Sequence, residues 1–269
     1  MSERDAVERS DAPVTMDTLV ADLRDLGLEA GDTVVVHSSL SALGWVAGGA
    51  ATVVDALIDV VTDDGTLVMP THSTQLSDPK SWGNPPVPES WYDDVKEGSA
   101  AYRPAVTPTR GMGAIAECFR NYPGVRRSRH PCHSFAARGA DAVAVTEGHA
   151  YDYPLGEESP LARVYDRDGL VLLLGVDHDT NTSLHLAEHR ATYSKTKTVD
   201  GGPILVDGER RWRAYDDIEG DTSDFSDLGA DFEAATDVST GAVGEGSATL
   251  CSQVDLVDFA VEWFAENRE

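Results

Sequence analysis

The sequence predicts an α/β protein that folds as one domain with loop and hairpin insertions. Two observations carry this prediction. Apolar strand-like segments alternate with helix-patterned segments in the first third of the chain, which is typical of a βαβ unit. Further along, the run Leu170–Gly175 is apolar without alternation up to its glycine, as in a central strand covered on both faces. No internal repeat or linker divides the chain.

The βαβ unit is predicted from the order of its segments. A helix over Met16–Gly27 has apolar residues at helical spacing, and the apolar strand Thr33–Val36 follows it. A glycine-containing loop then leads to a second helix over Ala50–Val61, patterned in the same way. The second strand, Thr66–Met69, runs into Pro70-Thr71-His72.

The remaining segments are less regular. Residues 73–108 are rich in Pro, Gly, Trp and Asp, and long irregular segments of this kind are usually functional loops, so we expect this one to cover a pocket. Turn signals at 200–202 and 207–208 flank a short strand and predict a hairpin. Residues 1–15 are expected to form a flexible N-terminal segment before a domain of residues 16–269. Other elements are expected as helices over Gly113–Asn121 and Thr182–Ala191, a strand over Ser134–Arg138 and a last amphipathic helix beyond Val254.

The charge balance is strongly acidic, with 47 acidic and 21 basic residues and a net charge of −26. Phosphate binding needs a basic surface, so this composition argues against nucleic acid as a partner. Two explanations of the acidity remain open: a field that attracts a polycationic substrate, or acidification of the whole surface that keeps a halophilic-type protein hydrated in concentrated salt. The second is favoured because the acids are spread along the chain and only four residues are lysines.

The three cysteines, Cys118, Cys132 and Cys251, argue against a disulfide framework and for a reducing compartment. The polar, acidic N-terminal residues are unlike a signal peptide, and no apolar run approaches the ~20 residues of a membrane span. We therefore expect a cytoplasmic protein with no membrane partner.

The richest candidate site follows the apolar strand directly, where α/β sheets bind ligands. A helix starting near Thr182 places His185 in its first turn, with Glu188 and His189 three and four residues further on. A carboxylate beside a histidine can fix its tautomer and stabilise the imidazolium during proton transfer. The alternative is structural: Asp179, Asn181 and Thr182 are also good helix caps.

The same residues allow a metal interpretation. His185-Leu186-Ala187-Glu188-His189 spells the H-x-x-E-H pattern of inverted zinc peptidases. Two histidines on one helix face could bind zinc, with Glu188 as a base. The pattern is short, and we expect no metal.

A second candidate site is the loop His37-Ser38-Ser39, which ends the first strand and precedes Gly44, Gly48 and Gly49. Backbone N–H groups and hydroxyls in such a loop could hold phosphate or pyrophosphate, although a plain glycine-rich turn explains it too. The sequence has no Walker loop, dinucleotide fingerprint or G-x-S-x-G nucleophile elbow.

Six blocks of the chain occur in a recognisable order from about residue 16 to 265: Gly31–Leu40 with Leu43-Gly44-Trp45 and Gly48-Gly49; Asp64–Thr71; Thr107–Arg110 with Gly113; His130-Pro131 with His133–Gly139; Ser159–Ala162; and Leu172–His189. Taken together, these blocks resemble the aminoglycoside N3-acetyltransferase family, also called antibiotic N-acetyltransferases. The acidic tract Asp216–Asp231 and Cys132 depart from the family pattern.

The resemblance implies a three-layer α/β/α sandwich around a central mixed sheet and direct acetyl transfer from acetyl-CoA to an amine of an aminoglycoside or related amino sugar, without a metal. It implies His185 as the base and Glu188 as its partner, with Asp179 and Asn181 near the cationic acceptor. The residues implied to contact CoA are His37, Ser38, Ser39, Gly44, Trp45, Thr71, His133 and Ser134.

Two other functions stay open at this point: a zinc-dependent hydrolase that uses the H-x-x-E-H residues, and a CoA-binding protein without transferase activity. A homodimer is compatible with the sequence, which does not fix the oligomeric state.

Overall fold

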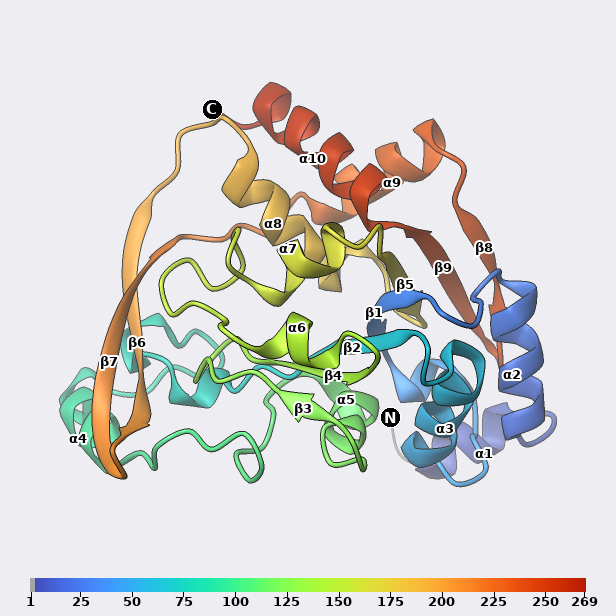
Figure 1. The fold of residues 1–269 in the computed structure, drawn as a ribbon, viewed down its shortest axis with the longest axis horizontal. Helices are drawn as coiled ribbons and strands as arrows, with labels where there is room; N and C mark the ends of the chain where they lie inside the picture. The colour runs from blue at the N-terminus through green and yellow to red at the C-terminus, as the bar shows by residue number, and fades with distance from the viewer. Residues whose placement is uncertain (1–2) are drawn as a thin grey trace.

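A seven-stranded mixed sheet forms the centre of the computed structural model, which describes residues 3–269 (Figure 1). Its strand order is β3-β4-β2-β1-β5-β9-β8. Three neighbouring strands, β2, β1 and β5, are parallel, and the outer strands pair antiparallel. The strands are β1 (Thr33–Ser38), β2 (Thr66–Pro70), β3 (Arg126–Arg127), β4 (Phe135–Gly139), β5 (Leu170–Leu174), β8 (Ser239–Val243) and β9 (Gly246–Ser252).

Helices cover both faces of the sheet, which confirms the α/β/α prediction. Because strand side chains alternate, Val34 and Val36 pack into one core while Val35 packs into the other. One face carries α2 (Met16–Asp25), α3 (Ala50–Val61) and α5 (Gly113–Phe119). The other carries α6 (Ala142–Thr146), α7 (Pro160–Tyr165), α8 (Ser183–Arg190), α9 (Phe225–Ala235) and α10 (Gln253–Asn267).

A separate two-stranded hairpin, β6 (Lys197–Val206) and β7 (Glu209–Ile218), runs along one side of the molecule from α8 towards α4 (Figure 1). The predicted turn at Asp207-Gly208 joins its strands, but the predicted turn at 200–202 is wrong because these residues lie inside β6. Gly201 and Gly202 instead allow neighbouring residues to pack closely against the β6 backbone. A Cβ at Gly201 would lie 2.4 Å from the Trp212 indole nitrogen, and one at Gly202 would lie 2.8 Å from the Pro131 ring.

Several elements were not predicted. The acidic tract contains α9, whose Phe225, Leu228 and Phe232 are buried at helical spacing while the acids occupy its exposed side. Residues 3–15, expected to be flexible, contain α1 (Glu3–Arg9), and Val14 is buried and bridges to Val46. The predicted loop 73–108 contains α4 (Tyr92–Gly98). Short 3-10 turns lie at Leu40–Ala42, Thr74–Leu76, Pro79–Ser81, Glu89–Trp91 and His178–Thr180.

Within residues 3–269, none of the helices combines the length and the apolar character that crossing a membrane requires.

Candidate active site

The parallel strands bring the two candidate sites of the sequence to one edge of the sheet. Because β1, β2 and β5 run in the same direction, His37 at the end of β1 and the segment after β5 lie close together. The alternation along β1 turns His37 towards the helix layer that contains α8. There its Nε2 lies 3.2 Å from the Thr182 hydroxyl. Burial, followed by repulsion from His178 and His185, lowers the pKa of His37 to about 3, so this imidazole is neutral.

His185 and Glu188 form a hydrogen-bonded pair on α8, as the sequence predicted for their side chains. His185 Nδ1 donates to Glu188 Oε2 at 2.5 Å. They are three positions apart on the helix, which places both on one face. With Nδ1 engaged in this way, Nε2 of His185 is the nitrogen left to accept a proton from a bound molecule.

Glu188 is 1% exposed, and its second oxygen is also occupied. Arg268 Nη1 and the Asp221 backbone N–H donate to Oε1 at 2.6 and 3.0 Å. Burial alone raises the pKa of Glu188, but the hydrogen bonds from His185, Arg268 and Asp221 outweigh it and lower the pKa. The carboxylate is therefore held ionised beside His185.

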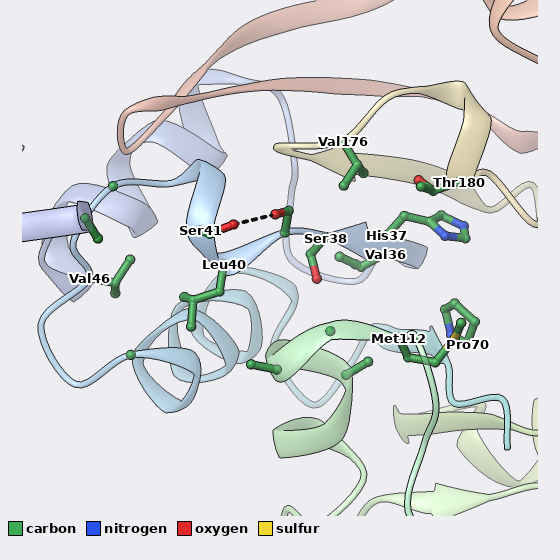
Figure 2. Close-up of a pocket in the computed structure, with 18 of the residues that line it drawn as sticks. Val36, His37, Ser38, Leu40, Ser41, Val46, Pro70, Met112, Val176 and Thr180 are labelled. Carbon is green, nitrogen blue, oxygen red and sulfur yellow. Dashed lines mark hydrogen bonds between the residues drawn. The ribbon is translucent and has the colours of Figure 1, made fainter. Parts of the chain in front are cut away.

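A cavity of about 670 Å³ opens next to the start of α8, the helix that carries this pair. Its walls are mostly apolar and come from the end of β1, the loop up to α3, the start of α5 and the segment between β5 and α8 (Figure 2). Five of the residues that the family resemblance implied as CoA contacts line it: His37, Ser38, Ser39, Gly44 and Trp45. Thr182 lines it as well, and its carbonyl accepts the backbone N–H of His185, so the dyad sits one helical turn from the cavity.

Glycines give part of the cavity wall a bare backbone. Gly49 and Gly111 line the cavity with φ of +66° and +75°, which side chains rarely adopt, and a Cβ at either would meet nothing within 4 Å. Gly49 is also the N-cap of the twelve-residue helix α3. Free N–H groups and the helix dipole at such an end favour phosphate groups.

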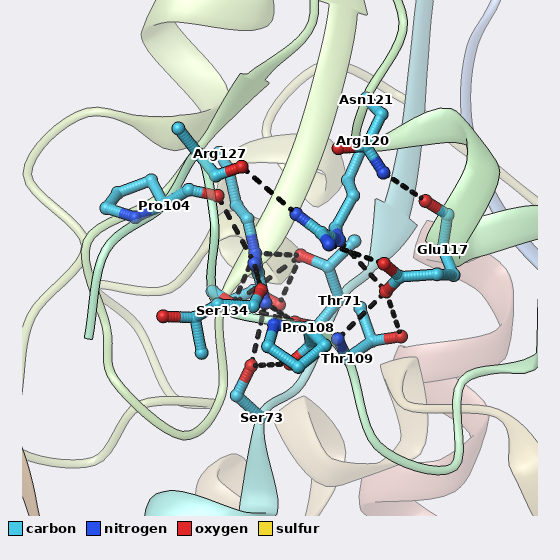
Figure 3. A network of polar contacts seen from close by, with 12 residues as sticks. Thr71, Ser73, Pro104, Pro108, Thr109, Glu117, Arg120, Asn121, Arg127 and Ser134 are labelled. Carbon is cyan, nitrogen blue, oxygen red and sulfur yellow. Dashed lines mark hydrogen bonds and ion pairs between the residues drawn. The ribbon is translucent and has the colours of Figure 1, made fainter. Parts of the chain in front are cut away.

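Thr71 and Ser134 were implied as CoA contacts, but both are fully buried and neither lines this cavity. They belong to a polar network around Arg127, shown in Figure 3. Arg127 Nε donates to Thr71 Oγ1 and Ser134 Oγ, each at 3.1 Å, and its Nη1 donates to the loop carbonyls of Pro104 and Thr107. The network ties the loop of residues 73–108 to the sheet.

His133 lines a second, polar cavity of about 300 Å³. It shares this cavity with Trp82, Arg110 and Asp200, and the remaining walls come from the loop that the sequence expected to cover a pocket. The ring of His133 lies 5.3 Å from that of His72, in an edge contact.

The two residues implied as acceptor contacts, Asn181 and Asp179, do not lie against the His185–Glu188 pair. Asn181 is buried and structural: its Oδ1 accepts the Ser183 N–H at 3.1 Å at the start of α8, and its amide lies 3.3 Å from His178. Asp179 is exposed in the turn before it. Neither side chain touches the His185–Glu188 pair.

The acidic tract supplies site residues that the sequence reasoning missed. The segment from Asp217 to Asp224 crosses the functional face of α8: Asp217 Oδ1 lies 3.7 Å from His189 Nε2, and a Cβ on Gly220 would lie 3.3 Å from the His185 ring. Arg268, beyond α10, reaches the same place. No spacing signal in the sequence links these residues, because the hairpin and α10 bring them to α8 from far along the chain.

The metal interpretation finds no geometric support within residues 3–269, where no group of three or more His, Cys, Asp or Glu side chains is arranged to hold an ion. His185 faces Glu188 and His189 faces Asp217, so the two histidines do not converge on one point.

The family model described as aminoglycoside 3-N-acetyltransferase matches residues 35–265. The chain belongs to this family. It is therefore an acyltransferase of the aminoglycoside 3-N-acetyltransferase type. Among curated relatives, the SPbeta prophage-derived aminoglycoside N(3')-acetyltransferase-like protein YokD of Bacillus subtilis is 49% identical, over 97% of this chain and 96% of that protein. Aminoglycoside N(3)-acetyltransferase VII of Streptomyces paromomycinus is 41% identical, over 99% and 96%.

Solved structures of family members superpose closely on this fold. The crystal structure of YokD gives a TM-score of 0.95 at 48% identity, covering 98% of both chains. The structure titled as AAC-IIIb binary with CoASH gives 0.86 at 29% identity, covering 96% of this chain and 98% of that one. AAC-VIa bound to sisomicin gives 0.86 at 32% identity, covering 96% and 99%.

Proposed function

We propose that this enzyme transfers an acetyl group from acetyl-CoA to an amine of an aminoglycoside, at the 3-amino position, or of a related amino sugar. The observation that carries the proposal is the His185–Glu188 pair, bonded at 2.5 Å one helical turn from the large cavity. Family membership supports the reaction, and the titles of two similar structures name CoASH and sisomicin as bound molecules.

In the proposed reaction, His185 Nε2 takes a proton from the amine as its nitrogen attacks the thioester carbonyl carbon. Glu188 stabilises the imidazolium that forms. The carbon–sulfur bond breaks, CoA leaves as its thiolate, and the proton held by His185 passes to the sulfur. A positioned general base of this kind contributes about 10²–10⁴-fold to the rate.

The cavity residues His37, Ser38, Ser39, Gly44 and Trp45 would hold CoA. The N-terminus of α3 and the bare backbone at Gly49 suit its phosphates, and the apolar walls suit its pantetheine arm. Thr71 and Ser134 would act indirectly, by fixing the loop through Arg127.

Asp217 is a better placed partner for a cationic acceptor than Asp179. Burial raises the pKa of Asp217 to about 6, so the group is mostly ionised at neutral pH. Its one ion-pair contact within residues 3–269 is His189, whose own pKa burial lowers to about 4. A carboxylate charge without a cationic partner therefore faces the side of α8 that carries His185.

The test is thiol release from acetyl-CoA by the purified protein, with aminoglycosides, other amino sugars and simple amines as acceptors. Release that depends on an aminoglycoside supports the proposal, and mass spectrometry of the product locates the acetyl group. CoA binding without release for any amine points to a non-catalytic CoA-binding protein. Activity that chelators abolish would return the zinc hydrolase to consideration.

A further inference from the structure

Arg268 lies behind the His185–Glu188 pair, contacts Glu188 and is held in place by several other hydrogen bonds. Its Nη1 donates to Glu188 Oε1 at 2.6 Å. Nε and Nη2 donate to the two oxygens of Asp224 at 2.8 and 2.5 Å, and Nη2 also donates to the Asp221 carbonyl at 2.6 Å. The guanidinium carbon lies 3.9 Å from the centre of the Phe264 ring, which fixes its plane.

The arrangement gives each oxygen of Glu188 a separate partner. His185 holds Oε2, while Arg268 and the Asp221 N–H hold Oε1. Rotation of the carboxylate would break both sets of bonds, so Oε2 stays directed at His185. Arg268 also fixes Asp221 through its carbonyl, so it supports both of the groups that hold Oε1.

The charges of Glu188, Arg268 and Asp224 are arranged as their hydrogen bonds are, with each carboxylate next to the guanidinium. A buried carboxylate without a cation is costly, and Glu188 is buried almost completely. Burial lowers the pKa of Arg268, but the bonds to Asp224 and Glu188 raise this pKa by more. The net pKa lies above the ordinary value for arginine, so the guanidinium is a permanent cation. Asp224 binds Nε and Nη2 of Arg268 and offsets part of its positive charge. Glu188 can therefore still stabilise a positive charge on His185.

We propose that Arg268 is a positioning residue of the catalytic site: anchored by Asp224, it keeps Glu188 charged and directed at His185, so that four side chains act as one chain from His185 to Asp224. The inference rests on the proposed function, in which His185 and Glu188 handle the proton. Arg268 itself would touch neither the acceptor nor CoA.

The experiment compares Arg268→Ala and Arg268→Lys with a matched control, Arg190→Ala. Arg190 also binds a carboxylate through two nitrogens, Glu157 at 2.7 and 3.0 Å, and covers the Tyr165 ring at 4.0 Å, but it does not touch the dyad. We expect Arg268→Ala to lower kcat about ten- to a hundredfold, the effect of losing a hydrogen bond to a charged group. The KM for acetyl-CoA should be unchanged, and Arg190→Ala should keep kcat within about twofold, as for a surface pair.

Added guanidinium should restore part of the kcat of Arg268→Ala and none in Glu188→Gln. Arg268→Lys, which keeps the charge without the planar fork, should fall between Arg268→Ala and the unaltered enzyme. Equal losses in Arg268→Ala and Arg190→Ala, or no rescue by guanidinium, would show a merely structural role and overturn the inference.

A second readout does not depend on turnover. The carboxyl carbon of Glu188, followed by NMR, should titrate at higher pH in Arg268→Ala and in Arg268→Lys than in the unaltered protein, and should not move in Arg190→Ala. If this shift appears while no amine is acetylated, the proposed function fails and the role of Arg268 in holding Glu188 stands. An unchanged Glu188 titration in both Arg268 variants would overturn the inference whatever the activity.

Discussion

At the residue scale, the dyad could be found from the sequence because its members are close along the chain. His185 and Glu188 are three positions apart on one helix, and helix geometry alone makes them neighbours. Arg268 and Asp217 could not be found in this way. They reach α8 from beyond α10 and from the β6–β7 hairpin, and the acidic composition hides Asp217 among many surface carboxylates.

Asn181 shows a different limit. The family resemblance implied that it lies near the cationic acceptor, but in the structure its amide bonds His178 and Ser183. A polar residue before a helix satisfies the helix first, and the sequence does not say whether any hydrogen-bonding capacity is left for a ligand.

Asp217 allows a test of acceptor recognition. Asp217→Asn should raise the KM for acceptors with several ammonium groups by about tenfold or more, since a hydrogen bond to a charged group is lost. The KM for a monoamine should change little. Asp216→Asn is the matched control, because Asp216 is exposed on the other face of β7. Steady-state kinetics measures the KM of both variants for each acceptor. Equal changes in KM for the two variants would show that Asp217 does not bind the acceptor.

At the element scale, the sequence predicts strands and helices well where a core side chain recurs at regular spacing. The helix Ala50–Val61 was predicted to the residue, and the parallel strands within two residues. The hairpin shows why the rest was harder. Asp200-Gly201-Gly202 has the composition of a turn, and only the tertiary contact with Trp212 and Pro131 explains glycine inside a strand.

Because Pro131 packs closely against Gly202, adding one methyl group at Gly202 should clearly lower the stability of the fold. Gly202→Ala places a Cβ 2.8 Å from the Pro131 ring and 3.1 Å from Cys132 Sγ, so it should destabilise the fold by about 1–3 kcal/mol through overpacking. Gly98→Ala, at an exposed position where a Cβ meets nothing within 4 Å, should be neutral or slightly stabilising. Urea denaturation of both variants measures the difference, and equal stabilities would refute the packing argument.

At the scale of the whole molecule, the fold gathers five buried or half-buried histidines. Burial is the first cause that lowers the pKa of each, so all are neutral in the fold. They are His37, His72, His130, His133 and His149. In the unfolded chain these side chains bind protons near pH 6.5. Burial raises the pKa of Asp217 and Asp200, which has the opposite effect on how stability depends on pH, but these two groups are fewer than the five histidines.

The free energy of unfolding should therefore fall as the pH drops from about 6.5 towards 4, by about 1.4 kcal/mol per pH unit for each proton that only the unfolded chain binds. Denaturant titrations at several pH values measure the slope. A net uptake of several protons on unfolding near pH 5.5 is expected, and a flat profile between pH 7.5 and 5 would contradict it.

The net charge of −26 is a property of the whole surface. Repulsion among so many carboxylates opposes the compact state, and salt screens it, with a Debye length that falls from about 10 Å at 0.1 M to about 3 Å at 1 M. We propose that the acidity is of the halophilic type, so the melting temperature and kcat should rise over this range. Sucrose, which stabilises without screening, is the control. Highest stability and activity in low salt would contradict this proposal.

The central claim is that His185 carries the proton during acetyl transfer. The most direct measurement is the kcat of His185→Ala for thiol release from acetyl-CoA with a saturating acceptor, alongside calorimetric binding of CoA to the same variant. If His185 is the base, the kcat of this variant falls by about 10²–10⁴-fold while its CoA affinity is unchanged. An unchanged kcat with intact CoA binding would contradict this role of His185 and assign the proton transfer to another residue.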